Sequence, residues 1–143
     1  MLIKITNNHP QTKIIDKNAH RLTKNVLADE KIVAKEINII FVTDDYLKSL
    51  HNDYLQDNSY TDVMTFNLSD NQSIEGEIYI APDRAGIYAR QFQIAPEIEI
   101  ARLIIHGLLH LKGLDDATEA QQAIMRSKED HYLEKYSELL NLL

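Results

Sequence analysis

The hydrophobic pattern of the first 43 residues changes period twice. Residues 2–6 form a short apolar and β-branched run that predicts a strand, and residues 36–43 (EINIIFVT) form a second, unbroken run that predicts a buried strand. Between them, residues 11–30 predict a helix, because their apolar positions recur at helical spacing. These positions are Ile14, Ile15, Ala19, Leu22, Val26 and Leu27. A strand, a helix and another strand predict a right-handed crossover between parallel strands.

The next segment predicts a short helix and a hairpin. Asp44 is placed to cap a helix that ends near Tyr54. Two runs typical of strands follow, at 61–68 (TDVMTFNL) and 77–81 (EIYIA), and the polar, turn-rich segment 69–76 separates them. This spacing predicts an antiparallel hairpin with a longer loop.

Helical patterns continue from Pro82 to the end of the chain. Three helices are predicted, over residues 82–92, 96–112 and 118–142. Proline at the first position begins the first two helices, Gly113 ends the second, and Thr118 with Gln121 forms a capping box for the third. The order β α β α β β α α α predicts an α+β domain: a small mixed four-stranded sheet with an antiparallel edge hairpin, covered by about five helices.

Length and composition assign this pattern to one ordinary domain. The chain has 143 residues, of which 44% are hydrophobic and 26% are charged. We therefore expect a single domain over residues 1–143, since the chain is long enough to bury a core and too short for two ordinary domains. The net charge of −7 argues against a bulk polyanion as the partner. The absence of cysteine excludes disulfides, thiolate metal sites and cysteine nucleophiles.

The N-terminal sequence MLIKITNNHP has no basic segment followed by a long apolar run, so we expect no signal peptide. No apolar run approaches the roughly 20 residues that a membrane-spanning helix needs. A chain without cysteine also suits a reducing compartment. The sequence therefore predicts a cytoplasmic protein with no membrane segment.

The segment 106–116 (HGLLHLKGLDD) carries the most informative chemistry. His106 and His110 lie four residues apart on a predicted helix that is apolar on all sides, so both imidazoles face one way and can approach one ion. Gly113 ends this helix and lets the chain turn back to offer Asp116 as a third ligand, with Asp115 as its rival. Three protein ligands leave one position open, which is typical of catalytic metal sites.

The alternative is a pair of core histidines that hydrogen-bond to backbone carbonyls. Two histidines at this spacing, followed by a glycine and two aspartates, favour the metal site, because each unpaired buried polar group costs about 1–3 kcal/mol. Without cysteine, the nitrogen and oxygen ligands suit zinc, iron(II), manganese or nickel.

The spacing of these three ligands also matches that of the metzincin metallopeptidases. Those enzymes carry a glutamate, their general base, directly after the first histidine, where this chain has Gly107. A metallopeptidase is therefore an alternative that lacks its central catalytic residue.

The segment HGLLHLKGLDD resembles the HGxLHLxGxDH signature of the YbeY family, the bacterial endoribonucleases of ribosomal RNA maturation. Further segments are similar to family motifs in the same order, namely 61–66 (TDVMTF), 76–78 (GEI) and 125–129 (MRSKE). The resemblance covers essentially the whole chain.

The resemblance implies a small α+β fold, one zinc ion and metal-dependent cleavage of single-stranded RNA. It also implies action near the 3′ end of 16S ribosomal RNA, a role in ribosome quality control, and the small ribosomal subunit as partner. His106 and His110 fall on the first two zinc-ligand positions, and Asp116 stands where most members have histidine. Zinc is the first choice, and this harder, anionic ligand adds weight to Mn²⁺ or Fe²⁺.

A second departure from the family concerns an arginine that many members carry shortly before the TDV motif. Leu55 stands at that position here, and Arg84 is a candidate substitute for phosphate contact. Asp62 is a candidate for orienting a ligand histidine, with a polar residue at a strand end as the alternative. The sequence names no general base.

Basic residues form a stripe along the first predicted helix. Lys13, Lys17, Arg21 and Lys24 follow one another at helical spacing on one face. Residues 1–35 carry seven Lys or Arg and three Asp or Glu, a net charge of +4, whereas the remainder carries −11. The stripe predicts a surface for RNA phosphates, with an ordinary solvated helix face as the alternative.

The leading hypothesis is a zinc-dependent endoribonuclease of the YbeY type. A noncatalytic ribosome-associated factor, with a structural or degraded metal site, is the alternative from another class. Leu55 is the feature that keeps this alternative open.

Overall fold

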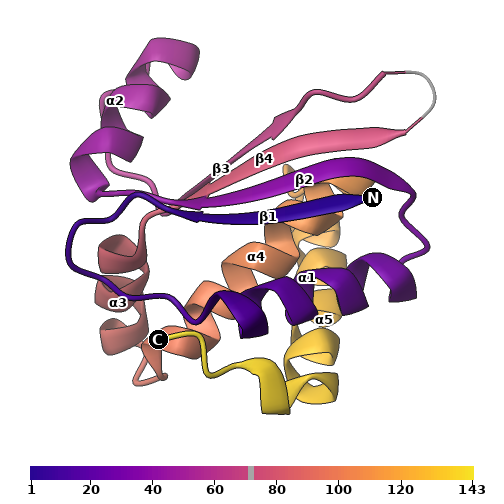
Figure 1. Cartoon of the computed structure of the whole chain (residues 1–143). Helices are drawn as coiled ribbons and strands as arrows, with labels where there is room; N and C mark the ends of the chain where they lie inside the picture. Colours follow the sequence, from indigo (N-terminus) through magenta and orange to yellow (C-terminus); the bar gives the residue numbers. More distant parts are fainter. Residues whose placement is uncertain (71–72) are drawn as a thin grey trace.

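The computed structural model describes residues 1–70 and 73–143, and its elements follow the order expected of an α+β domain (Figure 1). In chain order these elements are β1 (Leu2–Asn7), α1 (Asp16–Asp29), β2 (Ala34–Phe41), α2 (Asp44–Leu55), β3 (Val63–Asn67), β4 (Ile74–Ile80), α3 (Pro82–Gln91), α4 (Pro96–Lys112), α5 (Glu119–Lys135) and the 3₁₀ helix η1 (Ser137–Leu139).

The four strands form one mixed sheet in the order β1–β2–β4–β3. β2 pairs in parallel with both β1 and β4, while β3 pairs antiparallel with β4 and forms an edge of the sheet. The predicted four-stranded sheet with an antiparallel edge hairpin is therefore confirmed. The predicted hairpin loop over 69–76 includes residues 71 and 72, which lie outside the described residues, and β4 begins inside that range, at Ile74.

The helices cover the two faces of the sheet unequally. Figure 1 shows α1, α4 and α5 beneath the sheet and α2 above one end of it. Ile37 and Ile39 of β2 point into the main core beneath the sheet, whereas Ile40 joins a smaller cluster on the opposite face with Leu47 of α2. This alternation is the period of two that a strand buried on both faces requires.

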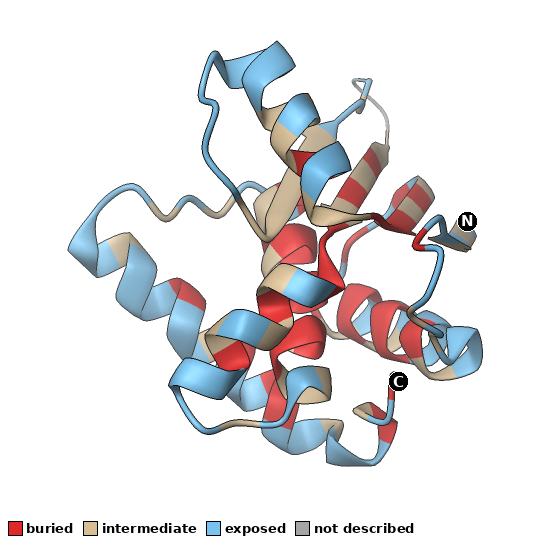
Figure 2. Cartoon of the chain, turned by 90° about the vertical axis from the view of Figure 1, so that its left-hand side faces the viewer, coloured by how far each residue is buried: buried red, intermediate tan, exposed pale blue. Residues whose placement is uncertain are grey.

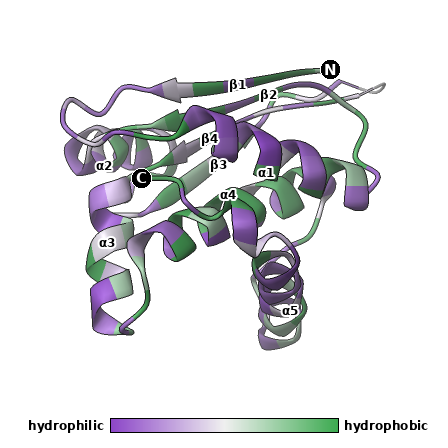
Figure 3. Cartoon of the chain, turned by 60° about the horizontal axis from the view of Figure 1, so that its bottom comes forward, coloured by the Kyte–Doolittle hydropathy of each residue, from purple (hydrophilic) through white to green (hydrophobic). Residues whose placement is uncertain are grey.

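α4 is the central helix of the main core. Most of its residues are buried (Figure 2), whereas Ile98, Arg102, His106 and His110 are half-buried along one side. Much of its ribbon is coloured as hydrophobic in Figure 3. It contacts β3 and β4 above it and α1, α3 and α5 around it. The prediction of a buried helix over 96–112 is confirmed for most of its surface, because its apolar residues pack into the main core. The half-buried side is the one that carries the two histidines.

Gly107 lets α4 approach the sheet closely. A Cβ atom at this position would lie 2.8 Å from the side chain of Ile78 in β4, closer than carbon atoms pack. The same face of α4 therefore has no room for a glutamate after His106. This contact explains in structural terms why Gly107 occupies the position of the metzincin base.

The predicted start of α1 and the predicted end of α5 were wrong. α1 begins at Asp16 instead of Gln11, because the His9 Nδ1 atom accepts the backbone N–H groups of Gln11 and Thr12 and holds them in a turn. α5 ends at Lys135 instead of near Leu142, because the C-terminal segment folds back onto α1. There the backbone oxygen of Leu142 accepts the N–H of Ile15, at 2.7 Å.

The predicted cap of α2 was wrong by one residue. Thr43 is the N-cap, and its hydroxyl accepts the backbone N–H of Tyr46, so Asp44 lies inside the first turn. Both residue types cap helices and favour this position, so the pattern alone does not choose between neighbours. The capping box of Thr118 and Gln121 at the start of α5 is confirmed, with both of its hydrogen bonds present.

Among residues 1–70 and 73–143, no helix combines the length and the hydropathy that crossing a membrane requires.

Candidate metal centre

Three side chains predicted to bind a metal converge at the C-terminal half of α4. The Nε2 atoms of His106 and His110 lie 3.0 Å apart, and the Asp116 Oδ2 atom lies 3.4 Å from the first and 3.5 Å from the second. Within the described part of the chain, this is the group of three metal-ligating side chains whose ligand atoms all lie within 4.8 Å of one another. Asp115, the rival third ligand, is not a member of this group.

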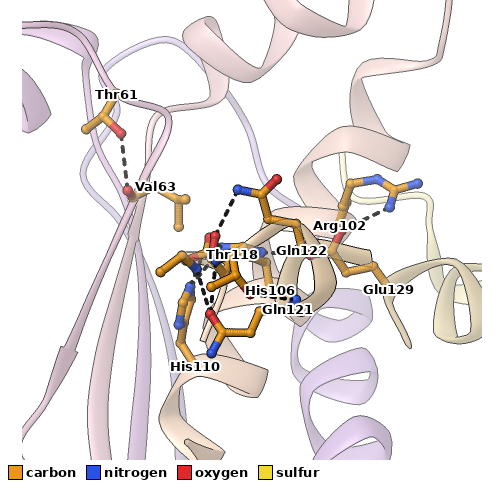
Figure 4. Close-up of polar contacts among 11 residues, drawn as sticks. Thr61, Val63, Arg102, His106, His110, Thr118, Gln121, Gln122 and Glu129 are labelled. Atoms are coloured by element: carbon orange, nitrogen blue, oxygen red, sulfur yellow. Dashed lines mark hydrogen bonds and ion pairs between the residues drawn. The ribbon is translucent and has the colours of Figure 1, made fainter. Parts of the chain in front are cut away.

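Local structure accounts for this convergence. One turn of α4 separates the two histidines, and Gly113 then ends the helix at a φ of 113°, a backbone conformation that glycine adopts without strain. The chain turns back and brings Asp116 against the histidines. Gln122 of α5 holds this return segment by donating its side-chain N–H to the backbone oxygen of Asp116 at 3.0 Å (Figure 4).

The spacing of the three ligand atoms fits a small divalent ion. Tetrahedral zinc binds nitrogen and oxygen at about 2.0–2.1 Å, which puts neighbouring ligand atoms roughly 3.4 Å apart. The observed separations of 3.0, 3.4 and 3.5 Å match that value. Two imidazoles and one carboxylate are also a donor set typical of catalytic zinc.

A buried carboxylate orients the first histidine. The Nδ1 atom of His106 donates to the Glu129 Oε2 atom at 2.7 Å, and the Glu129 residue is only 3% exposed. The other carboxylate oxygen of Glu129 accepts from Arg102 at 3.0 Å (Figure 4), and Arg102 in turn contacts Asp130 at 2.7 Å. This chain of contacts keeps a proton of His106 on Nδ1 and points its Nε2 atom toward the other two ligands.

The surroundings of His106 favour its charged form. Burial of the ring opposes a positive charge, but the hydrogen bond and negative charge of Glu129, together with the nearby carboxylates of Asp116 and Asp62, outweigh burial and raise the pKa of His106. The site therefore carries an excess of negative charge around its imidazoles, which is suited to a cation.

Asp62 lies beside the three ligands but does not orient His106. Burial raises the pKa of Asp62, although the positive charges of His106 and Arg84 oppose this effect. The carboxylate that accepts the Nδ1 proton of His106 is Glu129, in place of the predicted Asp62. Asp62 therefore lies in the site as a carboxyl group that holds a proton more readily than usual.

The group of His106, His110 and Asp116, called the metal cluster below, opens into a cavity of about 740 Å³ that follows the outer edge of β3. Leu55, which the family resemblance places where many members have arginine, lines this cavity. None of its described lining residues is Lys or Arg. The residues that line it are His51, Tyr54, Leu55, Thr61, Asp62, Val63, Met64, Thr65, Phe66, Asn67, His106, His110, Leu111 and Asp116.

Arg84, the candidate substitute for that arginine, lines a neighbouring cavity. Its guanidinium lies over the ring of Tyr60 at 4.3 Å from the centroid and 3.5 Å from the Asp44 carboxylate. The two cavities share Thr61 and Asp62, so Arg84 lies on the other side of Asp62 from the three metal-ligating residues.

None of the four residues of the basic stripe lines the cavity beside the three metal-ligating side chains. Lys17, Arg21 and Lys24 lie on the exposed side of α1, but Lys13 precedes the helix, so the predicted continuous face is wrong at its first residue. α1 packs against β1 and α4, whereas the cavity follows β3 at the opposite edge of the sheet.

Sequence reasoning missed Glu129 and Arg102. The segment 125–129 was recognised only as a family motif, with no role for its glutamate. A glutamate in the middle of a helix ordinarily faces water, and nothing in the local pattern shows that this one packs against a helix 23 residues earlier in the chain.

Comparison with known proteins identifies relatives over nearly the whole chain. The family model described as Endoribonuclease YbeY matches residues 4–137. Proteins named Endoribonuclease YbeY are similar to this chain in Karelsulcia muelleri, with 41% identity over 76% of this chain and 77% of the relative, and in Amoebophilus asiaticus, with 39% identity over 87% and 82%. A third, from Flavobacterium psychrophilum, is 38% identical over 78% of this chain and 80% of its own length.

A solved structure has the same fold. The solution structure of TM1509 from Thermotoga maritima superimposes with a TM-score of 0.66 and 28% sequence identity. The match covers 94% of this chain and 87% of that protein. The arrangement of the sheet and helices is therefore shared with an experimentally determined structure.

Proposed function

The chain belongs to the YbeY family, and from this premise we propose that it is a metal-dependent endoribonuclease that cuts single-stranded RNA. We assign the activity to a single domain spanning residues 1–143. The observation that supports the metal dependence best is the convergence of three ligand atoms, from His106, His110 and Asp116, at separations of 3.0–3.5 Å.

These three residues hold one divalent ion in the proposed site. Zinc is the first choice for two imidazoles and a carboxylate, and the aspartate in place of a third histidine leaves Mn²⁺ and Fe²⁺ as alternatives. When bound, such an ion acidifies water and polarises an oxygen of the phosphodiester.

The residues around the ligands have separate tasks. Glu129 holds the Nδ1 proton of His106 and keeps the ring in its ligating orientation. Asp62 lines the cavity with a raised pKa, so it is the candidate to take up or return a proton near the reacting phosphate. Arg84, beyond Asp62, is the candidate cation for a phosphate next to the cleaved bond.

The resemblance to the family also supports a biological role. We propose that the substrate is 16S ribosomal RNA near its 3′ end, in maturation and in ribosome quality control. The small ribosomal subunit would then be the partner and the cytoplasm the place of action. The stripe of Lys17, Arg21 and Lys24, with Lys13 before it, is the candidate surface for more distant phosphates of such a large RNA.

The two alternatives are less well supported. A metallopeptidase needs a carboxylate after the first histidine, and Gly107 is packed against Ile78 with no space for one. A noncatalytic ribosome-associated factor is not favoured, because the relatives are named endoribonucleases.

Metal analysis and two substrates test the proposal. Purified protein should contain about one divalent ion per chain, and His110→Ala should lose it, while His131→Ala, an exposed histidine outside the cluster, should keep it. The metal-loaded protein should cleave single-stranded RNA and leave casein intact. Cleavage of casein alone would support the peptidase, and binding of ribosomal subunits without any cleavage would support the noncatalytic factor.

A further inference from the structure

We propose that the cavity beside the metal cluster contains a nucleobase-binding subsite formed by Tyr54, Leu55 and Phe66, which we call the base platform. This inference rests on the proposed endoribonuclease function and adds a substrate contact to it. In this subsite, a base adjacent to the cleaved phosphodiester stacks on the Tyr54 ring.

The platform exposes apolar surface that the fold does not use. Tyr54 is 61% exposed and Leu55 is 62% exposed at the end of α2, a helix in which Leu47 is the buried residue. The Tyr54 and Phe66 rings lie 4.9 Å apart at 65° to each other, so they form an edge-to-face pair with the tyrosine outermost. Exposed apolar side chains that gather in a cavity mark a binding site more often than scattered ones do.

The platform and the metal cluster line the same cavity, on opposite sides of β3. Side chains alternate across this strand: Val63 packs into the main core beneath the sheet, whereas Met64 packs above it with the cluster at α2. Phe66 is two residues after Met64, so its side chain points to the same face of the sheet and lies above it with Tyr54. An RNA strand that crosses the edge of β3 would therefore meet the platform on one side and the three metal ligands on the other.

The edge of β3 offers polar groups between these two sides. In the antiparallel pair with β4, the N–H of Leu68 bonds to Glu75 and the oxygen of Asp62 accepts from Ala81. The backbone groups of alternate residues therefore face away from β4, and among these Thr65 and Asn67 line the cavity. Such N–H and C=O groups match the donors and acceptors on the edge of a nucleobase.

The charge of the cavity favours a base over a second phosphate at the platform. Its described lining has no Lys or Arg, and Asp62 and Asp116 add negative charge. An anionic group on the platform would have no counter-charge, whereas an aromatic base is neutral and stacks on any exposed ring. Leu55, at the position of the usual family arginine, is part of this apolar surface.

A fluorescent base tests the platform in the metal-loaded protein. In stopped-flow mixing, a short single-stranded RNA that carries 2-aminopurine should lose fluorescence on binding, before cleavage, because the base stacks on Tyr54. Tyr54→Ala should abolish this quenching and raise KM roughly 5- to 100-fold with little change in kcat, since stacking contacts contribute to binding on that scale. Tyr54→Phe keeps the ring and should behave like the wild type.

Tyr46→Ala is the matched control, because Tyr46 lies on the same helix, is 52% exposed and does not line the cavity. Cleavage by Tyr54→Ala with the wild-type KM and quenching would overturn the platform and leave the proposed function intact, and the apolar surface would then belong to another occupant, such as a protein chain.

An RNA with abasic residues in place of bases should bind as weakly to the wild type as normal RNA binds to Tyr54→Ala. Equal binding of both RNAs to the wild type would also overturn the platform. A wild type that neither cleaves nor quenches the RNA would refute both the platform and the proposed function.

Discussion

Replacement of Glu129 by glutamine should weaken metal binding without touching a metal ligand. In the wild type, one carboxylate oxygen accepts from His106 Nδ1 at 2.7 Å and the other accepts from Arg102 at 3.0 Å. Glutamine has one oxygen and one NH₂ group at these positions. Whichever way the amide turns, its NH₂ faces a donor, either the imidazole N–H or the guanidinium, so one of the two contacts is lost.

The size of the effect follows from the lost contact. A hydrogen bond to a charged group contributes about 1.5–3 kcal/mol, and every 1.4 kcal/mol corresponds to a factor of about ten in affinity. Replacement of a residue that holds a metal-ligating histidine commonly costs about 10- to 100-fold in metal affinity. We therefore expect Glu129→Gln to bind zinc roughly 10- to 100-fold more weakly than the wild type.

Competition with a chromophoric chelator measures this affinity directly. Asp130→Asn is the matched control, because Asp130 contacts Arg102 at 2.7 Å, is 58% exposed at its side chain and does not touch His106. Urea unfolding of both variants in excess chelator separates a loss of metal affinity from a loss of stability. Unchanged zinc affinity in Glu129→Gln, with the variant folded, would refute the positioning role of Glu129.

Three other outcomes follow from the structure. Burial opposes charge on Glu30, but hydrogen bonds from one tyrosine and two lysines outweigh it and lower its pKa from 4.5 to about 2. The folded state should therefore lose about 3 kcal/mol as the pH falls from above 4.5 toward 2, and the difference in urea stability between the wild type and Glu30→Gln should shrink across that range. Gly107→Ala should destabilise by about 1–3 kcal/mol in urea, since its Cβ would lie 2.8 Å from a β4 side chain, whereas Gly86→Ala, with nothing within 4 Å, should not. Charge reversal at Lys17 and Arg21 should reduce the salt dependence of binding to a long RNA and leave cleavage of a short oligonucleotide unchanged, because neither residue lines the cavity. A loss of short-substrate cleavage would contradict this location of the stripe.

The two histidines could be predicted because their geometry is local. A spacing of four residues puts both rings on one side of any helix, and the apolar neighbours of His106 and His110 indicate burial. The return of Asp116 also follows from Gly113, which ends the helix and lets the chain reverse. The sequence could not choose between Asp115 and Asp116 with certainty, because that choice depends on how α5 holds the turn.

Glu129 and Arg102 could not be predicted because their roles arise from packing between helices. The contact between Glu129 and His106 joins residues 23 positions apart, and no local period encodes it. The predicted start of α1 and the predicted end of α5 were wrong for a similar reason. They depend on His9 and on the fold-back of the C-terminal segment, which are tertiary contacts that override helical spacing.

The basic stripe on α1 and the proposed metal site occupy different parts of the surface. They would therefore serve different tasks, the first in holding RNA and the second in cleaving it. β1 and β3 lie at opposite edges of the four-stranded sheet, and α1 packs against β1 and α4. The stripe lies on the exposed side of α1 and lines no part of the cavity beside β3, so it does not contact a phosphodiester held there. In the proposed site, Leu55 adds no cation to the cavity, so charge on a bound phosphodiester would be left to the metal ion and to Arg84 as its candidate helper. Under this proposal the stripe would serve only to hold a large RNA, and the net charge of −7 would limit that contribution without bearing on the chemistry of cleavage.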